Sequence, residues 1–530
     1  MRLPAVREGA RARRAFCYPR EMSEHFDVLV VGAGLSGIGA AYHLKTRCPE
    51  KSFAILEGRE AIGGTWDLFR YPGIRSDSDM FTLGYSFKPW TDPKAIADGP
   101  SILRYIHETA REHDLERTIR FGHRVTRASW STPKARWELE VERSGGREPV
   151  TLTCNFLYSC AGYYRYDHGH TPDFAGRDRF AGRVVHPQHW TPDIEHAGKR
   201  VVVIGSGATA VTLVPALAKT AAHVVMLQRS PTYVVSRPAH DAIADGLRNH
   251  LPSRLAYGLS RWKNVLVGMA FFQVSRRRPA LTKKRIVDMV RAAVGPDVDV
   301  DRHFSPGYNP WDQRVCLVPD GDLFDALRQG RASVVTDAFE TFTEKGILLK
   351  SGHHLDADLV VTATGLELLF LGGMQLEVDG ARIDPSERLS YKGMMLDGVP
   401  NLACAFGYTN ASWTLKADLT AEYVCRLLRQ MDSVGASHCA PRNTDPDVGR
   451  EPFIDFSSGY VQRGAGRFPK QGSKHPWKVY QNYALDIVAL RLGSLVDGAM
   501  EFSAARQARA PTAAAGDAPG RVSGHSGGRE

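Results

Sequence analysis

Several features that would mark this chain as a membrane-spanning, disulfide-rich or metal-binding protein are absent from its sequence. No run of 18 apolar residues occurs in its 530 residues, so no segment is expected to span a membrane. The eight cysteines include no Cys-x-x-Cys pair, which argues against a structural zinc site and indicates reduced thiols. We therefore expect no bound metal and a location in the cytoplasm.

The chain also lacks a strong excess of charge on its core. The formal net charge is +10, but residues 1–21 contain six Arg against two Glu, and residues 503–530 contain four Arg against two acids. Subtracting the +4 and +2 of these two ends leaves a net charge of +4 on the core, which is too small to indicate nucleic-acid binding. Both ends of the chain have few apolar residues to bury. The N-terminal end also lacks the apolar segment that a signal peptide contains. We expect residues 1–22 to be a disordered basic extension and residues 503–530 a disordered tail.

A glycine-rich turn follows the apolar residues 26–31 and has the pattern Gly-x-Gly-x-x-Gly at Gly32, Gly34 and Gly37. Such glycines make a tight turn, let the backbone approach a pyrophosphate and allow helix and strand to pack closely. Glu57 ends the next apolar run, 20 residues after the third glycine, where a carboxylate accepts hydrogen bonds from ribose hydroxyls. The pattern predicts a dinucleotide with an unphosphorylated ribose, such as FAD.

A second glycine-rich turn follows residues 201–204 and ends in Ala rather than Gly, which the pattern tolerates. The next strand-like run ends in Arg229 instead of a carboxylate, and a guanidinium binds a ribose 2′-phosphate through charge-assisted hydrogen bonds. We therefore expect NADPH here, in preference to NADH. The residues expected to contact it are Gly205, Ser206, Gly207, Ala208, Thr209, Ala210, Arg229 and Ser230.

Between the two turns stands a third pattern, Phe-x-Gly-x-x-x-His-x-x-x-Trp, at residues 180–190. It resembles the fingerprint of type I Baeyer–Villiger monooxygenases, which belong to the class B flavin-containing monooxygenases. Thr191 follows the Trp where that family usually has Pro or Asp. The resemblance extends from about residue 22 to about residue 502. The segments that carry it are 63–66, 70–77 and 363–365, and three longer runs similar to a member that oxidises ketones and thioamide sulfur, 74–79, 309–314 and 407–416.

This resemblance implies an enzyme in which NADPH reduces FAD, the flavin captures O₂ as a C4a-peroxide, and that peroxide converts a ketone to an ester or lactone. It implies sulfide or thioamide oxidation as a second activity. The peroxide and its adduct are anionic, so they need a cation that cannot lose its proton, which favours arginine. The resemblance gives this catalytic role to Arg314 and makes Asp77 the carboxylate that orients it. Residues 76–79 are also typical of a helix N-cap, and both roles stay open for Asp77.

Motifs matched to the family supply the expected flavin site, and residues 408–413 are expected near the flavin ring. His186 and Trp190 are expected either to couple the domains or to pack as ordinary linker residues. The residues expected to contact FAD are Gly32, Gly34, Ser36, Gly37, Glu57, Gly64, Thr65, Trp66, Asp67, Leu68, Arg75, Ser76, Asp77 and Val125.

The order of the motifs predicts an α/β fold with two Rossmann-like dinucleotide-binding domains, the NADP domain being inserted into a split FAD domain. Two strand-like runs that end alike, residues 156–162 and 359–365, mark where the chain leaves and re-enters the FAD domain. The expected division is residues 23–163 for the first part of the FAD domain, 164–361 for the NADP domain with a helical insertion, and 362–502 for the second FAD part.

Within the insertion, residues 257–285 combine an apolar helix with basic clusters. A lid and a membrane-surface contact are two interpretations of this pattern. We favour a third, a buried helix with a solvated basic end. Substrate specificity is expected to reside in residues 255–300 and 366–400, while the oligomeric state is left open.

Three other functions compete with ketone oxidation. The first is a flavin monooxygenase that acts only on sulfur or nitrogen. The second, a pyridine-nucleotide disulfide reductase, needs a redox-active cysteine pair near the flavin, for which Cys154 and Cys160 are the nearest candidates. The third is a flavin-binding redox sensor without turnover. The pattern at residues 180–190 favours ketone oxidation over the first of these, and Arg314 and Asp77 argue against the third.

Overall fold

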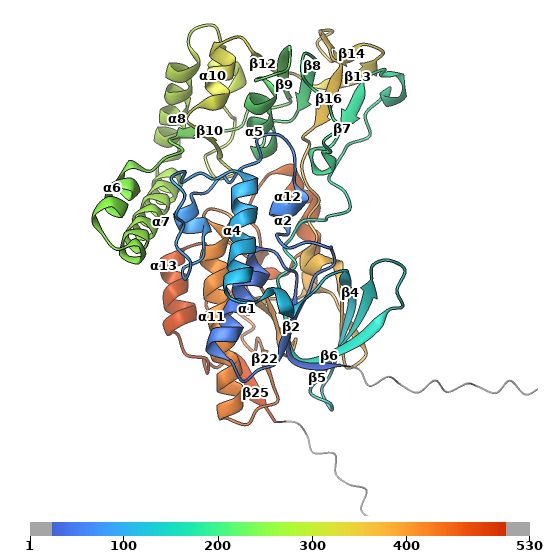
Figure 1. The fold of residues 1–530 in the computed structure, drawn as a ribbon, viewed down its shortest axis with the longest axis vertical. Helices are drawn as coiled ribbons and strands as arrows, with labels where there is room; N and C mark the ends of the chain where they lie inside the picture. Colours follow the sequence, from blue (N-terminus) through green and yellow to red (C-terminus); the bar gives the residue numbers. More distant parts are fainter. Residues whose placement is uncertain (1–23, 505–530) are drawn as a thin grey trace, which may run out of the picture.

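The computed structural model describes residues 24–504, which fold around two main β-sheets, the smaller at the top of Figure 1 and the larger below it. The extension expected at residues 1–22 and most of the expected tail lie outside the described residues. Ser503, however, belongs to strand β25 (Met500–Ser503), which pairs with β22 (His438–Pro441), so the ordered chain extends further than the sequence suggested.

The larger sheet has nine strands in the order β18-β17-β4-β5-β6-β1-β2-β3, with β21 also pairing with β6. Its centre is parallel, and the buried apolar run of β1 is typical of a strand covered on both faces. Helices α1 and α11 pack together on one face, and antiparallel strands β4 and β5 continue the sheet. The strands are β1 His25–Val31, β2 Phe53–Leu56, β3 Ile119–Arg120, β4 His123–Ser131, β5 Arg136–Arg143, β6 Val150–Ser159, β17 Gln375–Val378, β18 Ala381–Ile383 and β21 Leu402–Cys404.

The smaller sheet is entirely parallel, with five strands in the order β12-β9-β8-β16-β7. It is formed by the chain between β6 and β17 of the larger sheet, so a second Rossmann-like domain is inserted into the first, as the motif order predicted. The main strands and the small antiparallel sheet beside them are β7 Arg183–Val185, β8 Arg200–Ile204, β9 His223–Gln228, β12 Ala332–Thr336, β16 Leu359–Thr362, β13 Phe339–Thr343, β14 Gly346–Leu349 and β15 His354–Asp356.

The helices cover the sheets and bridge them, and none within residues 24–504 is long and apolar enough to cross a bilayer. They are α1 Leu35–Arg47, α2 Thr65–Leu68, α3 Met80–Leu83, α4 Gly99–Glu112, α5 Ala208–Leu217, α6 Ala242–His250, α7 Ser253–Arg277, α8 Pro279–Val294, α9 Val300–His303, α10 Asp322–Arg328, α11 Trp413–Ser433, α12 Gly459–Gly464 and α13 Tyr483–Asp486. Short strands complete the described chain: β10 Val234–Arg237, β11 Cys316–Pro319, β19 Ser390–Tyr391, β20 Met395–Leu396, β23 Arg450–Pro452 and β24 Lys470–Gly472.

Helix α7 leaves the inserted domain and packs against α3 of the larger domain. Its inner face, with Tyr257 and Arg261, is buried, but Leu259 and Leu266 on its outer face are 45% and 59% exposed. The expectation of a buried helix is therefore wrong for one face. An apolar run does not reveal how many of its sides the rest of the chain will cover.

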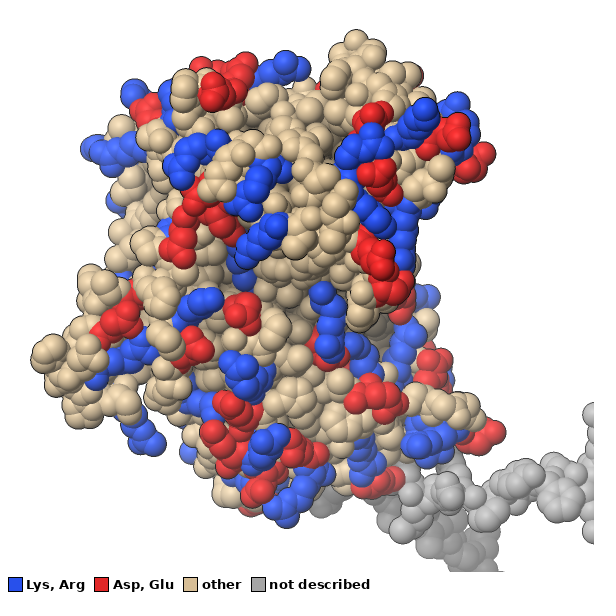
Figure 2. Space-filling view, turned by 45° about the horizontal axis from the view of Figure 1, so that its top comes forward, with Lys and Arg blue, Asp and Glu red and all other residues tan. Residues whose placement is uncertain are grey.

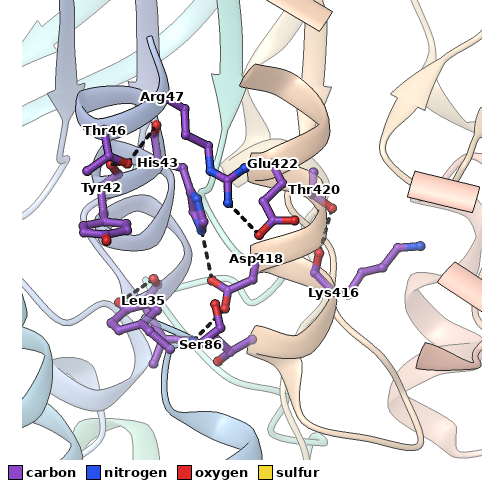
Figure 3. Close-up of polar contacts among 12 residues, drawn as sticks. Leu35, Tyr42, His43, Thr46, Arg47, Ser86, Lys416, Asp418, Thr420 and Glu422 are labelled. Atoms are coloured by element: carbon purple, nitrogen blue, oxygen red, sulfur yellow. Dashed lines mark hydrogen bonds and ion pairs between the residues drawn. The ribbon is translucent and has the colours of Figure 1, made fainter. Parts of the chain in front are cut away.

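Helix α11 carries buried charges whose partners come from α1 (Figure 3). Asp418 lies 3.5 Å from Nε2 of His43, and Glu422 lies 2.9 Å from a guanidinium nitrogen of Arg47. Arg261 of α7 reaches the same region, with Nη2 at 3.8 Å from Asp418. Asp418 thus joins the helical insertion to the larger domain, while Glu422 pairs within the larger domain.

Arg261 also supplies hydrogen bonds that the backbone needs, because its Nη1 donates to the carbonyl oxygens of Phe81 and Gly84, both at 2.8 Å. Replacing Arg261 by Met leaves these buried carbonyls unpaired, at a cost of about 1–3 kcal/mol for each group. We expect the melting temperature, followed by flavin fluorescence, to fall by about 3 °C or more. Arg254→Met, on the exposed side of the same helix, should leave it nearly unchanged. Equal melting temperatures for both variants would contradict this role.

Candidate active site

A cavity of about 550 Å³ lies where the two domains meet, and residues of both glycine-rich turns line it. Gly32 and Gly34 contribute from the larger domain, while Ala208 and Thr209 contribute from the inserted one. In open parallel sheets, ligands bind beyond the carboxyl ends of the strands, which is where both turns stand. The cavity is therefore positioned to bring two nucleotides together.

The first turn excludes side chains at the positions that carry its glycines. Gly32 has φ +102°, and a Cβ added there would lie 2.7 Å from the carbonyl oxygen of Cys160. A Cβ on Gly37 would lie 1.8 Å from the carbonyl oxygen of Gly32. Helix α1 follows with Gly34 as its N-cap and no side-chain hydrogen bond at that end. Its free N–H groups fit a pyrophosphate.

Glu57 lines the cavity next to this turn and is itself part of the turn's support. Its two carboxylate oxygens accept hydrogen bonds from the backbone N–H of Ala33, at 2.7 Å, and of Arg59, at 2.9 Å. Burial raises the pKa of Glu57 above its ordinary value. Each oxygen keeps a second lone pair, so the group suits ribose hydroxyls, and Val125 lines the same cavity.

The other residues expected at the flavin divide into two groups. Those that line the cavity are Ser36, Gly64, Thr65, Trp66, Arg75, Ser76 and Asp77. Gly37, Asp67 and Leu68 are not among the cavity-lining residues. Asp67 instead forms ion pairs with Arg59 and Arg70, so its side chain fixes the turn around Gly64 rather than facing the cavity.

The second turn repeats the geometry of the first. Gly205 has φ +135°, and an added Cβ would lie 2.3 Å from the carbonyl oxygen of Ala363. Helix α5 begins at Ala208 without a side-chain cap, which leaves N–H groups for a phosphate. Of the expected NADP contacts, only Ala208 and Thr209 line the cavity. The others lie outside its lining: Gly205, Ser206, Gly207, Ala210, Arg229 and Ser230.

Arg229 and Ser230 directly follow β9 and are exposed. Ser206 of the turn donates a hydrogen bond to the carbonyl oxygen of Ser230 at 3.2 Å, so the arginine stands close to the phosphate-binding turn. Among residues 24–504, Arg229 has no carboxylate within ion-pair distance. Its guanidinium is thus available to an anion that is not part of the protein.

Arg314 and Asp77 meet at the cavity wall, with Nε of the arginine 2.9 Å from Oδ2 of the carboxylate. Their side chains are 32% and 31% exposed. Asp77 raises the pKa of Arg314 above its ordinary value. The helix-cap role that the sequence left open belongs to Asp79, which accepts a hydrogen bond from Thr82 at the start of α3. Asp77 is left to pair with the arginine.

The pair is one of three ion pairs that the segment 75–79 makes with the inserted domain. Arg75 pairs with Asp322 at the start of α10, and Asp79 lies 3.7 Å from Arg237 of β10. Residues 75, 77 and 79 thus all reach the inserted domain, although the chain bends at residues 77 and 78. One short segment therefore both lines the cavity and joins the domains.

Aromatic residues that were not singled out individually form another wall of the cavity. The ring of Tyr163 stacks on Trp413 at 4.9 Å with an interplanar angle of 9°, and Trp413 donates a hydrogen bond to Ser36 at 2.8 Å. Burial raises the pKa of Tyr163 to about 12. The signal was the run of aromatics after Gly162, which follows a central strand at the carboxyl edge of the sheet.

His186 and Trp190 do not line the cavity. Nε2 of His186 donates to the carbonyl oxygen of Gly365 at 3.2 Å, which ties the chain entering the inserted domain to the chain leaving it. The seven cysteines of the described residues are all buried and unpaired. Cys154 and Cys160 stand six residues apart along β6, about 20 Å at the rise of a strand, which excludes the redox pair of a disulfide reductase.

The model of the flavin-binding monooxygenase-like family matches residues 83–252, and that of the NAD(P)-binding Rossmann-like domain matches residues 30–91. The FAD-containing monooxygenase EthA of Mycobacterium tuberculosis is 52% identical over 91% of this chain and 98% of its own length. The probable FAD-binding monooxygenase AlmA of Acinetobacter baylyi is 49% identical over 91% and 97%. The chain belongs to the FAD-containing monooxygenase family.

Two solved structures of monooxygenases share this fold. A steroid monooxygenase bound to NADP has a TM-score of 0.72 at 22% identity, over 91% of this chain and 100% of that one. Cyclohexanone monooxygenase bound to ε-caprolactone has a TM-score of 0.71 at 18% identity, with the same coverage. The expectation of a flavin monooxygenase with two dinucleotide domains is confirmed for this FAD-containing monooxygenase.

The close approach at Gly37 gives a direct test of the flavin site. Replacing Gly37 by Ala forces the start of α1 away from the turn, so we expect the purified protein to lose its flavin absorbance. Gly246→Ala in α6 is the matched control, because an added Cβ meets nothing within 4 Å there. Full flavin content in Gly37→Ala would show that this turn does not bind the cofactor.

Proposed function

We propose that the protein binds FAD at the first turn and NADPH at the second, and inserts one oxygen atom of O₂ next to the carbonyl carbon of a ketone. One ketone, one O₂, one NADPH and one proton then become an ester or lactone, one water and NADP⁺. Oxidation of sulfides or thioamides is proposed as a second activity. The observation that carries the proposal is the Arg314–Asp77 pair on the cavity shared by both turns.

Bound FAD supplies the electron transfer from NADPH to O₂ and the transfer of oxygen to the substrate. The chain supplies position and charge. Arg314 keeps its positive charge at every working pH because an arginine does not deprotonate, and the neighbouring carboxylate strengthens that tendency. A fixed cation stabilises negative charge that develops at a carbonyl oxygen, without reorganisation during the reaction. Asp77 holds the guanidinium in one orientation.

The substrate class follows from the surroundings of Arg314. A small, mainly apolar cavity of about 10 Å³ adjoins Arg314. Its walls are Tyr163, Leu368, Phe406, Tyr408, Thr409, Trp413, Ile454, Phe456, Tyr460 and Val461. We infer a ketone whose carbonyl oxygen faces Arg314 and whose apolar substituent contacts these rings.

The residues that line the cavities overlap only one of the two regions that the sequence predicted to determine substrate specificity. Within 366–400, Leu366, Leu369, Leu371 and Gly372 line the main cavity and Leu368 lines the small one, whereas residues 255–300 line neither. Monooxygenation restricted to sulfur or nitrogen is the alternative within the family, and a cation aimed at the cavity favours the ketone reaction over it. The cytoplasm is the proposed location, because the cysteines of the described residues are free thiols.

Arg314→Ala separates oxygen transfer from cofactor binding. We expect bound FAD to be retained, because the arginine makes no contact with the first turn, and the yield of ester to fall about 10²–10³-fold. NADPH should still be consumed, with hydrogen peroxide as the product. Asp77→Asn should show a weaker form of the same defect.

The measurement is ester formed for each NADPH consumed, with peroxide assayed in parallel. Arg276→Ala is the matched control, since Arg276 and Asp312 form an ion pair of the same length, 2.9 Å, away from the cavity. An unchanged ratio in Arg314→Ala would remove Arg314 from the mechanism.

Arg229→Ala tests the choice of nicotinamide cofactor. A charge-assisted contact to phosphate is worth about 1.5–3 kcal/mol, so the KM for NADPH should rise about 10- to 100-fold. The KM for NADH should hardly change, because NADH carries no 2′-phosphate. Lys219→Ala, an exposed cation after α5, is the control. Equal KM values for NADPH and NADH in the unmodified protein would overturn the assignment.

A further inference from the structure

Helix α7 presents an apolar stripe to solvent. Leu255, Leu259, Trp262 and Leu266 succeed one another at spacings of four, three and four, so they share one face of the helix. They are 51%, 45%, 46% and 59% exposed. The opposite face, which includes Arg261, is buried against the larger domain. The stripe is thus an uncovered surface on a helix that is otherwise firmly held.

A second apolar segment continues this stripe. Leu485, Val488, Leu492 and Val496, on α13 and the residues after it, are 49%, 58%, 71% and 63% exposed. The ring of Trp262 lies 5.8 Å from that of Tyr483 at the start of α13, which brings the two segments side by side (Figure 1). We call the eight side chains the apolar surface: Leu255, Leu259, Trp262, Leu266, Leu485, Val488, Leu492 and Val496.

Exposed apolar side chains are concentrated in this region of the molecule, whereas a freely solvated surface has them scattered singly. Of the large apolar side chains that are exposed within residues 24–504, all but Val434 lie on helices α6 to α8 or in residues 485–496. In Figure 2 the outermost part of the projecting end at the left, where α6 and α7 lie, is tan, with charged side chains beside it. Contiguous patches of this kind mark contacts with a membrane or another protein.

The charges around the apolar surface decide between these occupants. Helix α7 contains five basic residues and no acidic one, and its last two residues begin an exposed basic cluster, in which Arg276 pairs with Asp312 and Lys284 with Asp288. The exposed members of that cluster are Arg276, Arg277, Arg278, Lys284 and Arg285. A second copy of this chain, pairing through the same face, would bring two sets of these charges together. Anionic headgroups would instead neutralise them, while Leu and Trp side chains enter the boundary of the acyl chains.

We propose that α7 and residues 485–496 form a docking surface for lipid bilayers that carry anionic headgroups. An amphipathic helix of this kind lies in the plane of the interface, with its apolar face in the headgroup and acyl boundary and its basic side chains at the phosphates. The surface stands outside both cavities, so docking leaves the cofactor sites accessible.

The test is sedimentation of the full-length flavin-containing protein with lipid vesicles. We expect binding to phosphatidylcholine vesicles that contain phosphatidylglycerol, weaker binding to phosphatidylcholine alone, and loss of the difference at high salt. Leu259→Ser combined with Leu266→Ser should weaken binding to both compositions about tenfold or more. Arg277→Glu combined with Arg285→Glu should weaken binding to the anionic vesicles alone.

Two matched controls should bind like the unmodified protein. Val434→Ser removes an equally exposed apolar side chain at the end of α11, and Lys134→Glu combined with Arg147→Glu reverses two exposed charges in the turns beside β5. Flavin absorbance reports that each variant is folded, and the readout needs no turnover, so it is independent of the proposed reaction. Vesicle binding that is absent, or unchanged in the Leu variant, overturns the proposal. Self-association without lipid that the Leu variant abolishes would also overturn it, in favour of a second copy of the chain.

Discussion

The ion pair between Arg314 and Asp77 is the contact on which the site depends, because its two members come from different domains. Neither domain alone presents an oriented cation to the cavity. The same segment of the larger domain holds Arg75 against Asp322 and Asp79 near Arg237, so the site and the domain contact are built from one stretch of chain. A change that separates the domains therefore also disorders the arginine.

The two glycine-rich turns and helices α7 and α13 hold the domains in this arrangement and leave room for two nucleotides between them. Each Rossmann turn excludes side chains, as the close approaches at Gly37 and Gly205 show, and each leaves a helix N-terminus without a side-chain cap. Helix α7 braces the domains from outside through Arg261. Helix α13 separates the apolar surface from the cavity, since Asp486 on its inner side accepts a hydrogen bond from the cavity-lining Tyr408 at 2.6 Å.

Much of this organisation could be predicted from the sequence, because glycine turns and their flanking strands are local patterns with a physical cause. The fold class and the inserted domain were accessible in this way, whereas the meeting of Arg314 with Asp77 was implied by the family resemblance of their segments. The stacking of Tyr163 on Trp413 could not be predicted, since residues 250 positions apart in the chain meet only in the folded state. Nor could hydropathy tell that the outer face of α7 stays uncovered, because coverage depends on neighbours that are distant in sequence.

The central claim is that the cavity beside Arg314 is where one atom of O₂ enters a carbonyl substrate. The most direct measurement is to incubate the protein with NADPH, ¹⁸O₂ and an apolar methyl ketone, and to determine the mass of the product. The account predicts an ester that carries one ¹⁸O atom, formed with the consumption of one NADPH. Unchanged ketone, with NADPH oxidised to NADP⁺ and O₂ reduced to hydrogen peroxide, would contradict it, and so would an ester whose new oxygen comes from water.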